Sequence, residues 1–176
     1  MKIRLLEETD LENVLDVIET AFPDEENKLI MELATELVKD ASTYPIKSFV
    51  AEMDNQIIGY VSYSPILVKP DASISGYILA PLAVSPDYQK QGVGANLIRT
   101  GIDILTTEGF DALMVYGDPN YYGQFGFTES TARSFIPPYP LEYPFGWTGM
   151  MLSEKAAPQS PINFDCVESL AKPQLW

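Results

Sequence analysis

The chain has 176 residues, of which 46% are hydrophobic and 20% are charged, and its formal net charge is −14. This length and balance suit one globular domain and exclude a disordered chain. The acidic charge disfavours nucleic acid as a partner, and every apolar run is far shorter than the ~20 residues of a membrane-spanning helix. We therefore expect neither nucleic acid nor a membrane as a partner.

The residue types limit the chemistry that the chain can perform. It contains no histidine and one cysteine, Cys166. Ser-His-Asp triads, Cys-His pairs and histidine-ligated zinc sites are therefore excluded, and we expect no metal. A lone cysteine and an N-terminus without a signal-peptide pattern favour a cytoplasmic location.

The acidic residues are unevenly distributed. Residues 1–54 carry 14 Asp or Glu and 5 Lys or Arg, whereas residues 55–176 carry 11 and 6. A field of this sign attracts cationic substrates, although solubility alone explains the same pattern.

Two helices are predicted near the N-terminus. Thr9-Asp10-Leu11-Glu12 has the form of a capping box, and apolar residues at helical spacing predict a helix over about residues 10–22, which Pro23 ends. A second amphipathic helix follows. Its apolar face consists of Leu29, Ile30, Leu33, Leu37 and Val38.

A hairpin and a buried strand are predicted next. Strand-like runs at residues 48–52 and 57–64 flank a turn in which Asp54 and Asn55 tolerate a positive φ. A looser segment is expected at residues 65–72. The apolar run at residues 77–84 predicts a buried strand, and Pro81 within it predicts a bulge or splay because proline cannot donate to a ladder.

Residues 92–107 have helical spacing, with Gly109 where a helix stop belongs. A short strand at residues 112–116, a turn at 117–120 and a helical turn at 121–125 should follow. Gly126-Phe127 should open another strand.

The tail is predicted to be an ordered extended loop over residues 134–146, with a last strand at residues 149–152. Its aromatic residues either wall an acceptor cleft, form a subunit contact or cover the core as a satellite cluster. They are Phe135, Tyr139, Tyr143, Phe145 and Trp147.

The strongest functional signal lies where the strand at residues 77–84 gives way to a helix. Gly92 and Gly94 allow the backbone to approach a ligand, and the free N–H groups of the first helical turn carry the positive end of the helix dipole. This pattern predicts an anion site suited to a phosphate, although turn geometry alone could require the glycines. The spacings of a dinucleotide-binding loop and of a Walker A loop do not match.

Gln89-x-x-Gly92-x-Gly94, after a strand that ends in Leu82-Ala83-Val84-x-Pro, resembles the acetyl-CoA signature Arg/Gln-x-x-Gly-x-Gly/Ala of the GNAT N-acetyltransferase superfamily. The resemblance covers most of residues 1–130. It implies an α/β (α+β) GNAT fold, in which helices flank a central, mostly antiparallel mixed sheet splayed around the strand at residues 77–84. It also implies acetyl-CoA as co-substrate, with the strand backbone on the pantetheine and the turn amides on the pyrophosphate. The implied cofactor-binding residues are Leu82, Ala83, Val84, Gln89, Lys90, Gln91, Gly92, Val93, Gly94 and Ala95.

The segment from Tyr122 to Phe127 resembles the Tyr-x-x-x-Gly-Phe element of the same family, in which the tyrosine lies close to the CoA sulfur. The resemblance implies that Tyr122 is the general acid, because a phenol with a pKa of ~10 is protonated at neutral pH. A packed core tyrosine is the alternative, and Tyr121 is the adjacent rival. Asn120 would contact the pantetheine or the acceptor, or would cap the turn.

The general base is unassigned. Many family members carry a glutamate on the strand before the pyrophosphate turn, but residues 74–84 contain no carboxylate here. Glu25 and Glu26 are candidates, although solvated surface side chains explain them more simply.

We therefore expect an N-acetyltransferase that forms a single domain over residues 1–176, with residues 134–176 as a C-terminal extension rich in proline and aromatic residues. It would move the acetyl group of acetyl-CoA directly to an amine of a small molecule or peptide in a ternary complex. The alternatives are a CoA-binding regulatory module without turnover and an acyltransferase that uses another acyl-CoA. The acceptor and the oligomeric state, including a homodimer, stay open.

Overall fold

The computed structural model describes residues 1–40, 45–69 and 73–176. These residues divide into two compact units. The first unit consists of Met1–Tyr63 and Ala80–Gly101, and the second consists of Ser64–Leu79 and Ile102–Trp176. The expectation of a single domain with a C-terminal extension stays a prediction. Part of the looser segment expected at residues 65–72 lies outside the described residues.

The main sheet has six strands. They are β1 (Lys2–Leu5), β2 (Lys47–Met53), β3 (Gln56–Pro65), β4 (Gly76–Val84), β5 (Ala112–Tyr116) and β7 (Trp147–Met151). The strand order is β1-β2-β3-β4-β5-β7. The pairs β1/β2, β2/β3 and β5/β7 are antiparallel, whereas β4 and β5 are parallel. The predicted mixed, mostly antiparallel sheet is confirmed.

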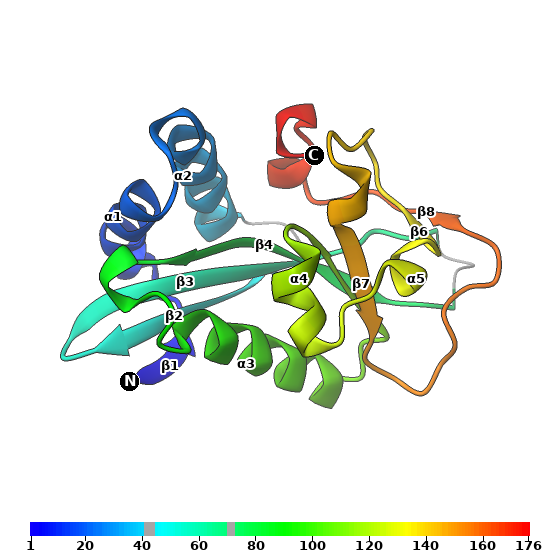
Figure 1. Ribbon diagram of the computed structural model, residues 1–176, viewed down its shortest axis with the longest axis horizontal. Helices are drawn as coiled ribbons and strands as arrows, with labels where there is room; N and C mark the ends of the chain where they lie inside the picture. The colour runs from blue at the N-terminus through cyan, green and yellow to red at the C-terminus, as the bar shows by residue number, and fades with distance from the viewer. Residues whose placement is uncertain (41–44, 70–72) are drawn as a thin grey trace. The chain divides into compact units, whose positions relative to one another are not determined.

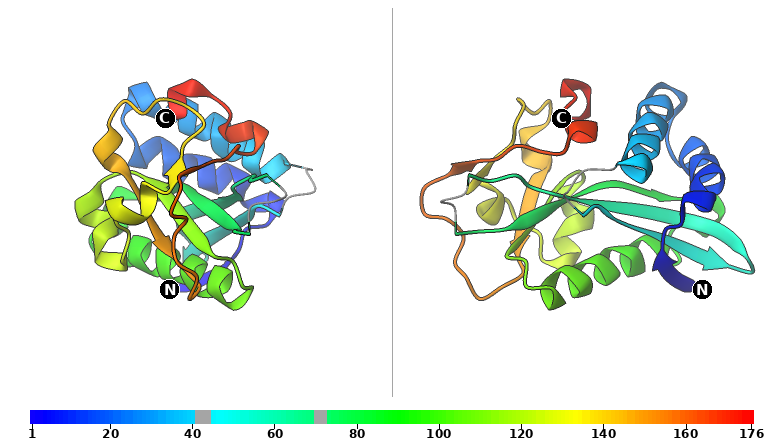
Figure 2. Two further views of the ribbon diagram at one scale, coloured as in Figure 1. Left: turned by 90° about the vertical axis from the view of Figure 1, so that its right-hand side faces the viewer. Right: turned by 180° about the vertical axis from the view of Figure 1, so that it is seen from behind.

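Helices cover both faces of β2 and β3 in the first unit. Helices α1 (Leu11–Ala21) and α2 (Asp24–Lys39) lie on one face, and residues 93–101 of α3 (Val93–Thr107) lie on the opposite face (Figures 1 and 2). Apolar side chains of α1 and α2 pack on the strands, and Leu33 and Leu37 of the predicted apolar face are buried. The cluster consists of Val14, Val17, Ile18, Ala34, Val50, Ile57, Tyr60 and Ala83.

The capping box predicted at Thr9 is wrong. A 3-10 turn over Glu8–Asp10 precedes α1, and the Asp10 carboxylate accepts the backbone N–H of Glu7 at 2.8 Å. The same carboxylate pairs with the guanidinium of Arg4 at 2.6 Å. Arg4 lies on β1, an edge strand that the sequence did not predict, and this ion pair joins the strand to the start of the helix.

The hairpin and the proline-interrupted strand are confirmed. Asp54 and Asn55 have φ values of 51° and 62° in the turn between β2 and β3. The parallel ladder of β4 with β5 runs from Gly76 to Leu79 and stops before Pro81. The Ala80–Pro81 peptide bond is cis. Helix α3 ends as predicted, with Gly109 at a φ of 83° just beyond it.

The second unit contains short elements after β5. They are α4 (Pro119–Tyr122), the 3-10 turn Gly123–Phe125, α5 (Glu129–Ala132) and a two-stranded parallel sheet of β6 (Phe135–Ile136) and β8 (Ile162–Asn163). The strand expected at Gly126-Phe127 is wrong, because Gly126 at a φ of 96° ends the 3-10 turn and only Thr128 forms an isolated bridge, to Gly149. The strand predicted at residues 149–152 corresponds to β7, which begins at Trp147 and ends at Met151, and β8 follows it in the chain.

None of the helices in the described part of the chain is long and apolar enough to cross a membrane.

Candidate functional site

The predicted cofactor-binding and catalytic residues divide between the units. The end of β4 and the turn after it, which hold Leu82 to Val84 and Gln89 to Ala95, belong to the first unit, whereas Asn120 and Tyr122 belong to the second. Burial alternates along the end of β4, where Ala83 is buried and Leu82 and Val84 are half-buried.

Two side-chain amides fold the turn back on itself. The Gln89 amide donates to the carbonyl of Val84 at 3.0 Å, and the Gln91 amide donates to the carbonyl of Asp87 at 2.7 Å. The backbone N–H of Ser85 donates to Ile58 on β3 at 3.0 Å. Gln89 and Gln91 thus hold the shape of the turn with their side chains, which leaves its backbone to meet a ligand.

The backbone N–H groups of residues 90–95 make no close, well-aligned hydrogen bond to any residue that the structure describes, although residues 89–92 form a turn. The next N–H along the chain, that of Asn96, donates to Gly92 at 2.9 Å, so the helical ladder begins only there. Lys90 and Gly92 have φ values of 59° and 84°, which turn the chain sharply before α3. A run of unpaired N–H groups at a helix N-terminus is a strong anion-binding element.

The two glycines of the turn have different roles. A Cβ at position 92 would meet nothing within 4 Å. Glycine is needed there for the left-handed φ and not for space. Gly94 is buried in the first turn of α3, although the absence of a Cβ there predicted a direct approach to the ligand.

Asp118 positions the segment that carries Tyr122 and Asn120. Its carboxylate accepts the backbone N–H of Asn120 at 2.9 Å, and its carbonyl accepts that of Tyr122 at 3.0 Å. The residue that caps the turn is therefore Asp118 and not Asn120, whose side chain is exposed. Pro119, at the first position of α4, supplies a fixed φ suited to a helix start.

The ring of Tyr122 is held by its neighbours. It makes edge contacts with Tyr121 at a centroid distance of 5.2 Å and with Phe127 at 5.8 Å. Burial raises the pKa of the Tyr122 phenol above its ordinary value, and the neighbouring Tyr121 and Asp118 raise it further. The phenol is therefore neutral across the physiological pH range and can donate a proton or a hydrogen bond.

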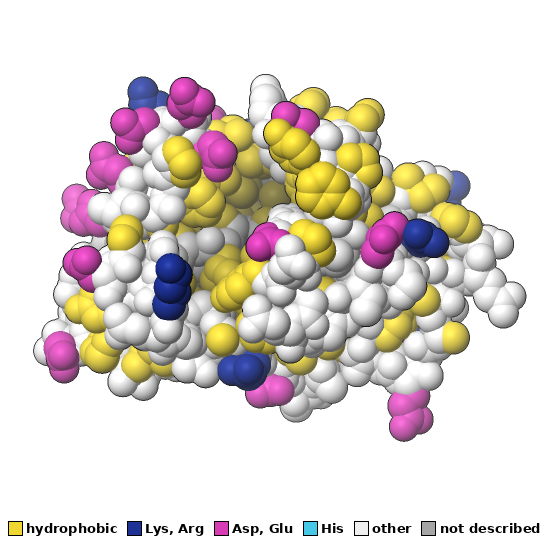
Figure 3. Space-filling view, in the orientation of Figure 1, with side chains coloured by type: hydrophobic (Ala, Val, Ile, Leu, Met, Phe, Trp, Pro, Cys, Tyr) yellow, Lys and Arg dark blue, Asp and Glu magenta, His cyan; other side chains and the backbone are white. Residues whose placement is uncertain are grey.

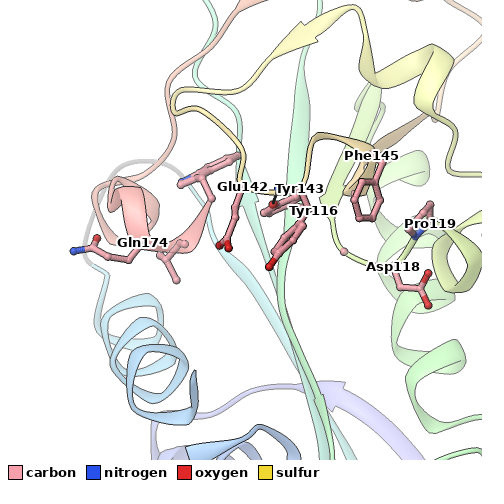
Figure 4. Close-up of a pocket in the computed structure, with 11 residues that line it drawn as sticks. Tyr116, Asp118, Pro119, Glu142, Tyr143, Phe145 and Gln174 are labelled. Atoms are coloured by element: carbon pink, nitrogen blue, oxygen red, sulfur yellow. Dashed lines mark hydrogen bonds between the residues drawn. The ribbon is translucent and has the colours of Figure 1, made fainter. Parts of the chain in front are cut away.

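A cavity of about 500 Å³ lies within the second unit. Figure 4 shows the Glu142 carboxylate and the Tyr116 hydroxyl pointing in the same direction from its wall. Tyr143 and Phe145 of this wall belong to the aromatic residues predicted as a candidate acceptor wall, whereas no sequence pattern indicated Glu142 or Trp176. The lining residues are Tyr116, Gly117, Asp118, Pro119, Glu142, Tyr143, Phe145, Gly146, Gln174, Leu175 and Trp176.

The candidate bases Glu25 and Glu26 are exposed in the first turn of α2. Carboxylates at this position stabilise the helix through its dipole, which explains them without catalysis. Within the described ranges, no group of three or more Asp, Glu, Cys or His side chains is arranged to hold a metal ion.

The sequence matches the profile of the Acetyltransferase (GNAT) family over residues 11–127. It is 35% identical over 131 residues to the uncharacterized N-acetyltransferase YjhQ of Escherichia coli strain K12, and the match covers 73% of this chain and 72% of YjhQ. It is 39% identical over 74 residues to the uncharacterized N-acetyltransferase YhbS of the same strain, a match that covers 42% of this chain and 44% of YhbS.

Solved structures of similar proteins hold the cofactor. The structure of E. coli YhbS in complex with CoA has a TM-score of 0.84 at 26% identity and covers 97% of this chain and 92% of its own. A GNAT family acetyltransferase from Brucella melitensis in complex with acetyl-CoA has a TM-score of 0.65 at 25% identity, covering 90% of this chain and 92% of its own.

Proposed function

We propose that this chain, a member of the Acetyltransferase (GNAT) family and, like its relatives, an N-acetyltransferase, transfers an acetyl group to an amine. The acetyl group would move directly from acetyl-CoA to the amine of a small molecule or peptide. The observation that carries this proposal is the row of backbone N–H groups at residues 90–95 that form no close hydrogen bond with the described residues. These groups would bind the pyrophosphate of CoA, with the positive end of α3 behind them. A cytoplasmic location and a homodimer stay predictions.

Cofactor binding would continue along β4. The backbone of Leu82, Ala83 and Val84 would meet the pantetheine arm, although the Val84 carbonyl already accepts the Gln89 amide. Asn120 stays a candidate contact for the pantetheine or the acceptor, since its side chain is exposed.

Tyr122 would act as the general acid. The neutral amine nitrogen attacks the thioester carbonyl carbon, the C–S bond of the tetrahedral intermediate breaks, and the phenol of Tyr122 gives its proton to the departing sulfur. An acceptor that binds as an ammonium ion first loses one proton to become the neutral amine, and the nitrogen loses a second proton after the attack. The base that takes these protons is still unassigned. Because the pKa of Tyr122 is raised, the phenol is protonated at neutral pH, which is the form that a proton or hydrogen-bond donor requires.

A covalent acetyl-enzyme is not needed for this reaction. Burial raises the pKa of the Cys166 thiol to about 11, so almost none of it is the nucleophilic thiolate at neutral pH. Direct transfer in a ternary complex is therefore favoured over a cysteine-bound intermediate.

Asn96→Asp tests the cofactor turn. Asn96 is exposed in the first turns of α3, so a carboxylate there stabilises the helix through its dipole while it repels a pyrophosphate. We expect the Kd for acetyl-CoA to rise about fivefold at low salt while Tm holds or increases. Asn163→Asp makes the same change in β8 and should leave the Kd unchanged. Equal affinity of the Asn96→Asp and parent proteins would show that CoA binds elsewhere.

The choice of acyl group is tested separately. Acetyl-, propionyl- and butyryl-CoA should be compared by CoA release with a saturating panel of amines. A higher kcat/KM for a longer acyl chain would replace the proposed acetyl transfer with the alternative acyl transfer.

A further inference from the structure

We propose that the cavity of the second unit binds the acceptor as an ammonium ion with an apolar, preferably aromatic, body. This inference rests on the proposed acetyl transfer and names the class of acceptor. A volume of about 500 Å³ suits a small organic molecule.

The aromatic wall of the cavity is held in place while its rings stay accessible. The backbone N–H of Tyr143 donates to the Tyr116 hydroxyl at 2.7 Å, and the N–H of Gly146 donates to the Tyr143 carbonyl at 2.8 Å. Yet 54% of Tyr143 and 65% of Phe145 are exposed. Exposed apolar rings on a hydrogen-bonded loop that lines a cavity are suited to contact a ligand.

Trp176, a lining residue near the C-terminus, is held in place by contacts with its neighbours. Trp176 makes ring contacts with Trp147 at 5.9 Å and with Tyr139 at 6.3 Å, and its indole N–H donates to the carbonyl of Leu170 at 2.9 Å. Indole and phenol rings attract cations through their faces, so Trp176, Tyr116 and Tyr143 can stabilise a positive charge as well as an apolar body.

The charges of the cavity have one sign. Its lining includes the carboxylates of Asp118 and Glu142 and no lysine or arginine. Glu142 makes no hydrogen bond or ion pair with any described residue, so no positive side chain of the described chain neutralises it. An anionic acceptor would be repelled, whereas an ammonium ion would gain a partner.

The cavity shares its wall with the segment that carries Tyr122. Gly117, Asp118 and Pro119 line the cavity, and the ring of Tyr122 packs against Gly117. An amine in the cavity would thus lie beside the segment that carries the proposed acid. The lining residues from the C-terminal part of the chain fall outside the family match of residues 11–127, as expected for a part that selects the acceptor of this particular chain. They are Glu142, Tyr143, Phe145, Gly146, Gln174, Leu175 and Trp176.

Three probes of related structure separate charge from apolar contact: 2-phenylethylamine, the neutral 2-phenylethanol and the ring-free ethylamine. Binding is measured by calorimetry at pH 7 on protein saturated with CoA, where no acetyl transfer takes place. We expect 2-phenylethylamine to bind at least tenfold more tightly than either of the other probes. The proposal is overturned if 2-phenylethylamine does not bind at millimolar concentration, or if either other probe binds as tightly.

The cavity itself is tested with Glu142→Gln and Phe145→Ala. Each variant should weaken 2-phenylethylamine binding about fivefold or more, while the affinity for acetyl-CoA is unchanged. Glu154→Gln, which removes an exposed carboxylate outside the cavity lining, is the control and should have no effect. If all three bind the probe like the parent, the acceptor site is elsewhere. That result leaves acetyl-CoA binding and turnover intact, so it is distinct from a failure of the proposed acetyl transfer.

Discussion

The backbone of Gly117 lies against the ring of Tyr122, so closely that a Cβ at position 117 would be 2.6 Å from Tyr122 Cε2. Only glycine allows the ring to occupy this place. The position of the proposed acid therefore depends on a residue five positions earlier in the chain, at the end of β5.

Gly117→Ala should displace the Tyr122 ring and lower kcat. A displacement of about 1 Å costs up to ~100-fold in an oriented reaction, and we expect a loss of at least tenfold with an unchanged Kd for acetyl-CoA. Gly123→Ala is the control, because nothing lies within 4 Å of a Cβ there. Its φ of −56° suits any residue. Full kcat in the Gly117→Ala protein would contradict a catalytic role for the ring.

Gly101→Ala in α3 should destabilise the protein. Alanine normally stabilises a helix interior by ~1 kcal/mol relative to glycine. Here the added Cβ would collide with the ring of Tyr63, whose hydroxyl donates to the carbonyls of Leu97 and Ile98 at 3.1 and 3.3 Å. We expect a net loss of about 1–3 kcal/mol in the free energy of unfolding, measured with urea.

The collision can be separated from the helix propensity with a double-mutant cycle. In a Tyr63→Leu background the ring is gone, so Gly101→Ala should cost less than it does in the parent. An equal cost in both backgrounds would show that the ring is not the cause.

The acidic surface of the first unit should affect acceptor kinetics. Figure 3 shows acidic side chains gathered over α1 and α2. If this field attracts a cationic acceptor, kcat/KM falls as salt rises, because the Debye length is only ~8 Å at physiological ionic strength. The rate should be compared at low and physiological salt for a cationic acceptor. A flat profile leaves solubility as the explanation.

The features predicted correctly from the sequence are those that neighbouring residues determine. Asp54 and Asn55 tolerate a positive φ, and they form the turn of the hairpin. The glycine-rich turn before α3 and the stop at Gly109 follow from glycine in the same way. Local composition suffices wherever the backbone conformation itself limits the choice of residue.

The features that the sequence missed depend on partners far along the chain. Arg4 pairs with Glu52 at 2.7 Å as well as with Asp10. These ion pairs stabilise the edge strand β1, which is too short to show an alternating apolar pattern in the sequence. The cavity joins Glu142 to Trp176 and to the end of β5. No spacing rule connects these segments, because their proximity arises from tertiary packing.

The test of Tyr122 is the variant Tyr122→Phe, which keeps the ring contact with Phe127 and removes only the hydroxyl. The Kd for acetyl-CoA should change little, and the single-turnover rate should fall by ~10²–10⁴-fold if proton transfer to sulfur is part of the slow step. Tyr121→Phe removes the adjacent hydroxyl and should keep the rate.

Because burial raises the pKa of Tyr122 above its ordinary value of ~10, the phenol stays protonated as the pH rises. The parent protein should therefore lose rate through this group only above about pH 10. The Tyr122→Phe protein lacks the ionising phenol, so its residual rate should not fall over the same range. A loss of rate in Tyr121→Phe alone would move the acid by one residue, and full rates in both variants would show that water protonates the thiolate.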